Sequence, residues 1–296
     1  MSGMPSLRAA GRDESGSMSP WWVALAGLAV MYIPMYWAAA GGLWQSDEHA
    51  HGVIVLVVAM WLFWTTRRGV ASACQSPSPA IGWLLFLFGL CVYLAGRVVG
   101  ITILEFSSQP LVLAGLLLVL KGPSALKVAW FPIVYLVFMI PLPGIFVDAV
   151  TGPLKSWISM IVVEMLHWAG YPIARNGVTI TAGQYQMLVA DACSGLHSMF
   201  SLSALGTLFM YIMDRRVLLH NAVMVAAILP IAFAANIIRV MVLVLVTYHL
   251  GDEAGQGFLH GMAGMFLMLV ALGSFFALDA ALAGIVGGTA GKPAIR

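Results

Sequence analysis

One cysteine of this sequence lies where its thiol could be reactive. Cys193 belongs to the stretch LVADACSGLHSMFSL, residues 188–202, in which a polar segment gives way to an apolar one that predicts a helix beginning near residue 196. Just before a helix start, free backbone N–H groups and the positive end of the helix dipole stabilise a thiolate. We therefore treat Cys193 as a candidate nucleophile and the adjacent Ser194 as a supporting residue.

The two other cysteines are not expected to pair with it. Cys74 falls in a predicted loop and Cys91 in the middle of an apolar run, so neither is predicted to lie within disulfide reach of residue 193. Cys91 is expected to be a small buried packing residue.

Two basic side chains in later apolar runs could assist a thiolate. Arg239 lies in AANIIRVMVLVLV, about ten residues or ~15 Å from the end of its run, and His260 lies at the start of the next run. A buried guanidinium needs an anion, either a structural carboxylate such as Asp191 or the oxyanion of a reaction. In acyl transfer a thiolate attacks a peptide carbonyl, an imidazole protonates the departing amine, and a guanidinium stabilises the oxyanion. These residue types indicate that chemistry.

The segment DEHAHG, residues 47–52, is a second polar cluster. Its two histidines stand at positions i and i+2, which do not share a helical face, and no cysteine or histidine cluster lies nearby, so no metal is expected. Two interpretations remain open. The segment holds the first helical hairpin in place, or it contacts substrate through Glu48 and His51. No other cofactor is expected.

Composition assigns the chain to the polytopic membrane proteins. Of its 296 residues 61% are hydrophobic and 9% are charged, and its mean hydropathy is +0.95, values that do not fit a soluble domain with one core. No basic run with interleaved aromatic residues accompanies the net charge of +2, so nucleic-acid binding is not expected. We predict an all-α bundle in which each crossing needs about 20 apolar residues.

One apolar segment is too polar to be counted as a crossing. Residues 144–170 carry Asp148, Pro153, Lys155 and Glu164, which are costly in lipid, so this segment is predicted to be a helix at the membrane interface. The other runs predict eight spans, at about residues 21–41, 52–66, 80–98, 106–120, 126–142, 196–213, 217–249 and 259–285.

The distribution of positive charge predicts the orientation of these spans. With eight spans, ten Lys and Arg residues lie on the inner side and three, Arg97, Lys155 and Arg175, lie on the outer side, as the positive-inside rule requires. Counting residues 144–170 as a ninth span nearly removes this asymmetry. Both termini are therefore predicted inside, and the face that carries Cys193 is predicted outside.

Residues 143–195 form the largest predicted outer element. Turn signals at residues 176–177 and 182–183 flank the β-prone runs VTIT and QYQMLV, so we predict a small extracytoplasmic hairpin that leads to Cys193. The predicted organisation is a disordered cytoplasmic lead at 1–19, a single membrane domain at 20–286 and a loose cytoplasmic tail at 287–296.

These motifs, in this order, resemble those of the exosortases, membrane-embedded cysteine transpeptidases of the exosortase/archaeosortase family. The chain departs from the commoner pattern at Ala50, at His197-Ser198 and at Asp191, and it is similar to the smaller subtype called exosortase B. The matching segments are WQSDEHAHG at 44–52, FPIVYLVFMIPLPGIFVDAVTGPLK at 131–155, ADACSGLHSMF at 190–200, AANIIRV at 234–240 and GFLHGMAGM at 257–265.

The resemblance implies residue roles, substrates and a location. Cys193 would be the nucleophile, Arg239 and His260 the other catalytic residues, and Asn236 a supporting residue. The substrates would be exported, membrane-anchored proteins with a C-terminal Pro-Glu-Pro motif, a transmembrane helix and a basic cluster. Cleavage would occur on the outer face of the inner membrane, in connection with exopolysaccharide. Water and an amine are both open as the acyl acceptor.

A non-enzymatic membrane protein is the alternative class. In a transporter or a polysaccharide-export component, Pro230 and Arg239 would mark a broken helix around an anionic substrate. That interpretation accounts for Arg239 but gives Cys193 no role.

Overall fold

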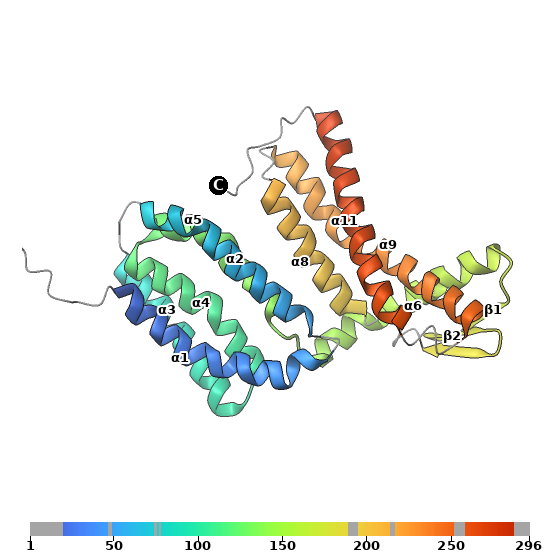
Figure 1. The fold of residues 1–296 in the computed structure, drawn as a ribbon, viewed down its shortest axis with the longest axis horizontal. Helices are drawn as coiled ribbons and strands as arrows, with labels where there is room; N and C mark the ends of the chain where they lie inside the picture. Colours follow the sequence, from blue (N-terminus) through green and yellow to red (C-terminus); the bar gives the residue numbers. More distant parts are fainter. Residues whose placement is uncertain are drawn as a thin grey trace, which may run out of the picture. The chain divides into compact units, whose positions relative to one another are not determined.

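The computed structural model describes residues 20–46, 49–73, 76, 78–188, 195–213, 217–251 and 258–286 (Figure 1). Long apolar helices and one small sheet make up this part of the chain, so the predicted fold class, an all-α polytopic membrane protein, is confirmed. The chain divides into two compact units, Met1–Gly42 and Leu43–Arg296. The described element of the first unit is the helix α1 (Pro20–Gly41).

The second unit contains all the candidate site residues. Its elements follow one another in this order: η1 (Leu43–Gln45), α2 (His51–Ser72), α3 (Pro79–Val99), α4 (Thr102–Leu120), α5 (Pro123–Tyr135), η2 (Leu136–Met139), α6 (Gly144–Trp168), β1 (Ile173–Asn176), β2 (Thr179–Ala182), β3 (Tyr185–Leu188), α8 (Gly195–Met213), α9 (Leu218–Leu250) and α11 (Phe258–Val286).

Glycines bring α3 and α4 close together. Gly82, Gly89 and Gly96 recur every seven residues on α3 and are buried, and a Cβ atom added at Gly89 would lie 3.0 Å from the backbone nitrogen of Val112 on α4. Small residues let helix backbones approach in a membrane, where packing rather than the hydrophobic effect holds helices together. Cys91 lies about 200° around the helix from Gly89 and is exposed. The expectation that Cys91 is buried was therefore wrong.

The helices α8, α9 and α11 pack against one another and form a bundle of their own (Figure 1). Their shared core is apolar. It consists of Leu202 and Phe209 of α8, Met224, Ile228, Ala232 and Ala235 of α9, and Ala271 and Phe275 of α11, all buried.

Aromatic contacts connect this bundle to α5 and η2, which precede α6 in the chain. The rings of Phe131 on α5 and Tyr211 on α8 are stacked, with centroids 3.8 Å apart, and Phe138 in η2 meets Phe200 of α8 edge to face at 5.9 Å. Such pairs stabilise a contact beyond the area that they bury. The start and the end of α8 are thus both anchored to α5 and η2.

The small sheet has three antiparallel strands in the order β1-β2-β3. The predicted turns are confirmed, since Gly177 and Gly183 adopt positive φ angles of 63° and 62°, a region that costs glycine nothing. The runs VTIT and QYQMLV supply β2 and β3, as predicted, but the prediction of a two-stranded hairpin missed β1. The alternation of β1 is weak, because one of its four residues is buried and three are exposed.

The sheet rests on α6 and on the C-terminal part of α9. Ile180 in the central strand is fully buried, and it packs in a cluster with Ile158 and Val162 of α6 and Val240 and Val244 of α9. At the edge of this cluster the hydroxyl of Tyr171 lies 3.2 Å from Nε2 of His249. The predicted outer element is therefore built on a helix that also belongs to the α8–α9–α11 bundle.

Six helices in the described part of the chain are long and apolar enough to cross a membrane, whereas eight spans were predicted. The two other predicted spans correspond to shorter apolar helices, Pro123–Met139 and Phe200–Met213. The first of these ends in the 3₁₀ turn η2, whose larger rise gives the segment a length of roughly 28 Å. The charged helix α6 is not among the six, and its position at the membrane interface stays a prediction.

Candidate functional site

A helix begins directly after the candidate nucleophile. The predicted start near residue 196 is confirmed, because α8 begins at Gly195. Cys193 itself lies outside the described residues, as do Ser194 and Asp191, so their roles stay predictions. A helix start has free backbone N–H groups and a positive dipole end, which would stabilise the expected thiolate.

Arg239 lies on α9 with its side chain in the protein interior. The residue is 5% exposed, and Asn236, three positions earlier on the same helical face, is fully buried. Arg239 stands where the two apolar clusters along α9 meet, since Ala235 belongs to the α8–α9–α11 core and Val240 to the core under the sheet. A guanidinium is costly to bury in such surroundings, which marks this position as a functional candidate.

The same helix bears on the alternative class. A transporter of the kind considered above would need a helix that is broken near Pro230. Instead, α9 runs without interruption from Leu218 to Leu250 and includes Pro230 in its interior. The feature that favoured a transporter is therefore not found in α9.

The start of α8 and Arg239 lie at comparable distances along their helices from the connection between α8 and α9. The helices α8 and α9 are consecutive and run in opposite directions, joined by the residues after Met213. Gly195 is roughly 27 Å from the end of α8, and Arg239 is roughly 32 Å from the start of α9, at 1.5 Å per residue. The remainder of α9 continues past Arg239 and supports the sheet.

His260 lies in the first turn of α11, the third helix of the bundle. Its backbone is helical, as predicted, and its side chain lies outside the described part of the structure. Because α11 packs against both α8 and α9, the helices that carry Arg239 and His260 and the helix that follows Cys193 are mutual neighbours. That the side chains of Cys193, Arg239 and His260 meet stays a prediction.

The polar segment at residues 47–52 lies at the start of α2. Glu48 is outside the described residues, and His51 is the first residue of the helix. The hydroxyl of Ser46 lies 3.2 Å from Nδ1 of His49. Substrate contact by Glu48 and His51 stays a prediction, as does the absence of a metal or other cofactor.

The tryptophan that precedes this segment packs into the helices around it. Trp44 meets Phe106 of α4 edge to face at 6.3 Å. Gly52 makes room for the indole, because a Cβ atom there would lie 2.5 Å from the tryptophan Nε1. This contact joins the residues before the polar segment to the first turns of α2 and α4. That the polar segment holds the first hairpin stays a prediction.

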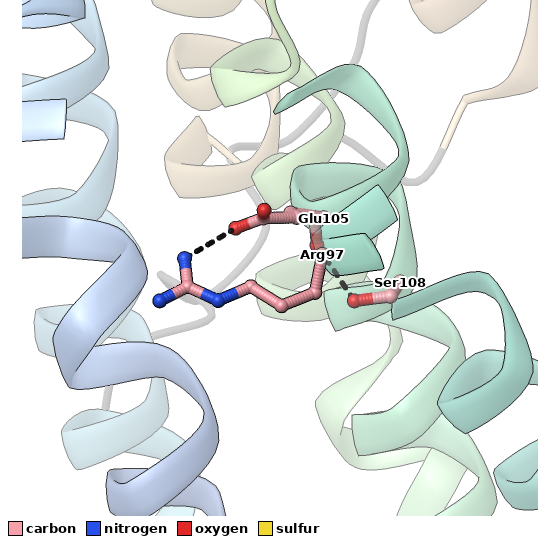
Figure 2. Close-up of polar contacts among 3 residues, drawn as sticks. All are labelled: Arg97, Glu105 and Ser108. Atoms are coloured by element: carbon pink, nitrogen blue, oxygen red, sulfur yellow. Dashed lines mark hydrogen bonds and ion pairs between the residues drawn. The ribbon is translucent and has the colours of Figure 1, made fainter. Parts of the chain in front are cut away.

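Sequence reasoning missed two polar pairs, one Arg–Glu ion pair and one His–Asp contact. Figure 2 shows the first, in which Nη1 of Arg97 lies 3.7 Å from Oε2 of Glu105 across the turn between α3 and α4. In the second, His220 Nε2 of α9 lies 2.8 Å from Oδ1 of Asp279 of α11. An acidic residue at the edge or in the middle of an apolar run was the signal that could have found both, because such residues are rare and usually paired.

The chain matches the family model described as transmembrane exosortase over residues 43–277. The chain belongs to the transmembrane exosortase family. The matched region begins where the second compact unit begins, and it includes Cys193, Arg239 and His260. Neither the curated proteins nor the solved structures contain a match.

Family membership gives this exosortase a coarse function. It is a multi-pass membrane protein of a family of transpeptidases that act in protein sorting. Its subtype stays a prediction.

Proposed function

We propose that this exosortase cleaves the C-terminal sorting signal of exported, membrane-anchored proteins through a thioester on Cys193. One observation carries most of the argument: α9 and α11, which bear Arg239 and His260, pack with α8, which begins just after Cys193. Residues that are far apart in the sequence are thereby carried by one bundle. The burial of Arg239 adds a fixed positive charge within it.

In the first step the thiolate sulfur of Cys193 attacks the scissile peptide carbonyl. The carbonyl electron pair moves onto oxygen, and the guanidinium of Arg239 stabilises the oxyanion with its N–H donors. When the intermediate collapses, the C–N bond breaks and protonated His260 gives its proton to the departing amine. The products are a thioester on Cys193 and the released C-terminal segment.

In the second step an acyl acceptor attacks the thioester. Water would give a free carboxylate, and an amine would give a new amide, with neutral His260 accepting the proton of the attacking group. The thiolate of Cys193 is regenerated in either case. Asn236, one turn before Arg239, would orient the guanidinium, and Asp191 and Ser194 would support the loop that carries the thiol.

The proposed substrate carries a Pro-Glu-Pro motif, a transmembrane helix and a basic cluster, with Glu48 and His51 contributing to its binding. The proposed location is the inner membrane, with both termini cytoplasmic and the active site on the outer face, in connection with exopolysaccharide production. The ten-to-three distribution of Lys and Arg supports this orientation. A reporter inserted at residues 175–185 should report outside and one placed after residue 216 inside; the opposite pair would reverse the orientation.

The function is tested by co-expressing the enzyme with an exported reporter that ends in the proposed signal. We expect a shortened reporter with wild-type enzyme and full-length reporter with Cys193→Ala. A membrane-impermeant maleimide added to intact spheroplasts should label Cys193 in a Cys74→Ser, Cys91→Ala background. A reporter that stays full length despite abundant wild-type enzyme in the membrane would contradict the proposal.

A further inference from the structure

His220 and Asp279 form a buried pair that the proposed reaction does not use. Their side chains are 1% and 8% exposed, and His220 Nε2 lies 2.8 Å from Asp279 Oδ1. His220 is the third residue of α9, and Asp279 lies in the C-terminal part of α11. The pair therefore joins the two helices far from the positions of Arg239 and His260.

On α9, the buried residues of one face lead from this pair to Arg239. They recur in steps of four, four, four, three and four, which keeps them on one side of an α-helix. Four of them belong to the core shared with α8 and α11. The face consists of His220, Met224, Ile228, Ala232, Ala235 and Arg239.

On α11, the corresponding face leads from Asp279 toward His260. Phe275 and Ala271 follow Asp279 at steps of four toward the helix start, and all three are buried. The same steps of four, four, four, three and four, counted from Asp279 toward the start of α11, give positions 275, 271, 267, 264 and 260. The separation from His220 to Arg239 equals that from Asp279 to His260, 19 residues in each case.

Equal separations have a geometric consequence in an antiparallel pair. The helices α9 and α11 are consecutive and pack side by side (Figure 1). If His220 and Asp279 lie at one level, positions 239 and 260 lie at a common level roughly 28 Å further along. A slip of one helical turn would displace one of them by about 5.4 Å relative to the other.

The apolar contacts of this interface do not fix such a register strongly. Met224, Ile228, Ala271 and Phe275 attract one another without strong directionality, so a shifted packing would retain much of their burial. A charge-assisted hydrogen bond differs, because a shift separates its partners and leaves each buried without the other. Buried polar pairs that specify a helix register are an attested use of such groups.

We propose that the His220–Asp279 pair sets the register of α11 on α9 and thereby holds Arg239 and His260 at one level for catalysis. Both are positioning residues. The inference deepens the proposed function and rests on it for the roles of Arg239 and His260, whereas the register itself can be measured without catalysis.

Disulfide cross-linking measures the register directly. In a background without native cysteines (Cys74→Ser, Cys91→Ala, Cys193→Ala), Ile228→Cys and Ala271→Cys occupy positions at one level and should cross-link on mild oxidation. Asp279→Ala should lower this cross-linking yield at least ~5-fold. It should raise the yield between Ile228→Cys and a cysteine at position 267 or 275, which lie one helical turn from position 271. Leu229→Ala, on the exposed side of α9, is the control and should change neither yield.

Reporter cleavage measures the catalytic consequence. A misplacement of about 1 Å can cost 10²-fold in rate, so we expect kcat of Asp279→Ala and of His220→Ala to fall at least ~10-fold with KM within about 2-fold. The exchange variant His220→Asp, Asp279→His restores the pair in reverse and should recover at least half of the cross-linking yield and of kcat. Asp279→Asn keeps a hydrogen-bonding group, so its kcat should lie between that of Asp279→Ala and that of the wild type.

The outcomes separate this inference from the proposed function. An unchanged cross-linking pattern in Asp279→Ala would overturn the register role, whether or not the reporter is cleaved. A changed pattern without a loss of kcat would overturn the positioning role. If a single variant does not accumulate, the exchange variant decides: its failure to restore the pattern at normal abundance contradicts the inference. A wild-type enzyme that leaves the reporter intact would count against the proposed function alone.

Discussion

The guanidinium of Arg97 and the carboxylate of Glu105 face one another across the turn that joins α3 to α4, 3.7 Å apart (Figure 2). The partners differ in environment, because the Arg97 side chain is 49% exposed and that of Glu105 is 10% exposed. Ser108 donates a hydrogen bond of 2.6 Å to the backbone carbonyl of Glu105 and secures the same turn of α4. The arginine thus reaches from the surface to balance a buried negative charge.

This arrangement predicts that Arg97→Ala destabilises the protein. An exposed ion pair contributes up to about 1 kcal/mol and a buried one more when a partner is removed, so we expect a loss of about 1 kcal/mol. Arg97→Lys should lose less. Thermal unfolding in detergent is the measurement, with Arg68→Ala, an exposed arginine of α2, as the control. Equal changes in Tm for Arg97→Ala and Arg68→Ala would show that the pair contributes nothing.

Replacement of the nucleophile should separate catalysis from folding. We expect Cys193→Ala to accumulate normally in the membrane and to cleave the reporter at least about 10³-fold more slowly, because no other group can form the acyl-enzyme. Cys91→Ala is the matched control: Cys91 is an exposed thiol of α3, and its loss should leave the rate unchanged. If Cys91→Ala lost activity while Cys193→Ala stayed active, the assignment of Cys193 as the nucleophile would be wrong.

Arg239 allows charge and geometry to be separated. A guanidinium is planar, always charged and able to donate two parallel hydrogen bonds, whereas a lysine is a flexible point charge. Loss of one oxyanion donor typically costs about 2.7 to 4 kcal/mol, so Arg239→Lys should fold yet react at least ~100-fold more slowly. Membrane abundance and the cleavage rate are measured together. Full abundance of Arg239→Lys with a near-wild-type cleavage rate would show that Arg239 has no part in the mechanism. Poor abundance of Arg239→Ala that recovers in Arg239→Lys would indicate a structural role.

The close contact of α3 and α4 predicts a position-specific effect of one methyl group. An added Cβ at Gly89 would lie 2.9 Å from Cγ2 of Val112 and 3.0 Å from its backbone nitrogen, whereas one at Gly273 would meet nothing within 4 Å. Overpacking costs about 1–3 kcal/mol, while alanine has the higher helix propensity at either site. Gly89→Ala should therefore lower the unfolding temperature and Gly273→Ala should keep or raise it. The same sign of change at both sites would contradict the packing.

Local features of the fold were determined by the sequence itself. The start of α8 near Cys193 and the turns at Gly177 and Gly183 were predicted, because a helix start and a positive φ angle depend on residues within a few positions of one another. The apolar runs likewise predicted the long helices. The charged segment that became α6 was set apart from them for the same reason, since the cost of a charge in lipid is a property of the residue.

Tertiary structure alone decided which helical faces meet. Nothing near Asp279 in the sequence identifies His220 as its partner. The glycine repeat around Cys91 is visible in the sequence, but only the packing of α4 on the glycine face shows that Cys91 is turned outward. The missed strand β1 is a similar case, because a short, mostly exposed strand is stabilised by the partner to which it bonds. In an almost uniformly apolar chain the periodic contrast between polar and apolar residues is weak, so helix orientation depends on small residues and on rare polar pairs whose partners are distant in the sequence.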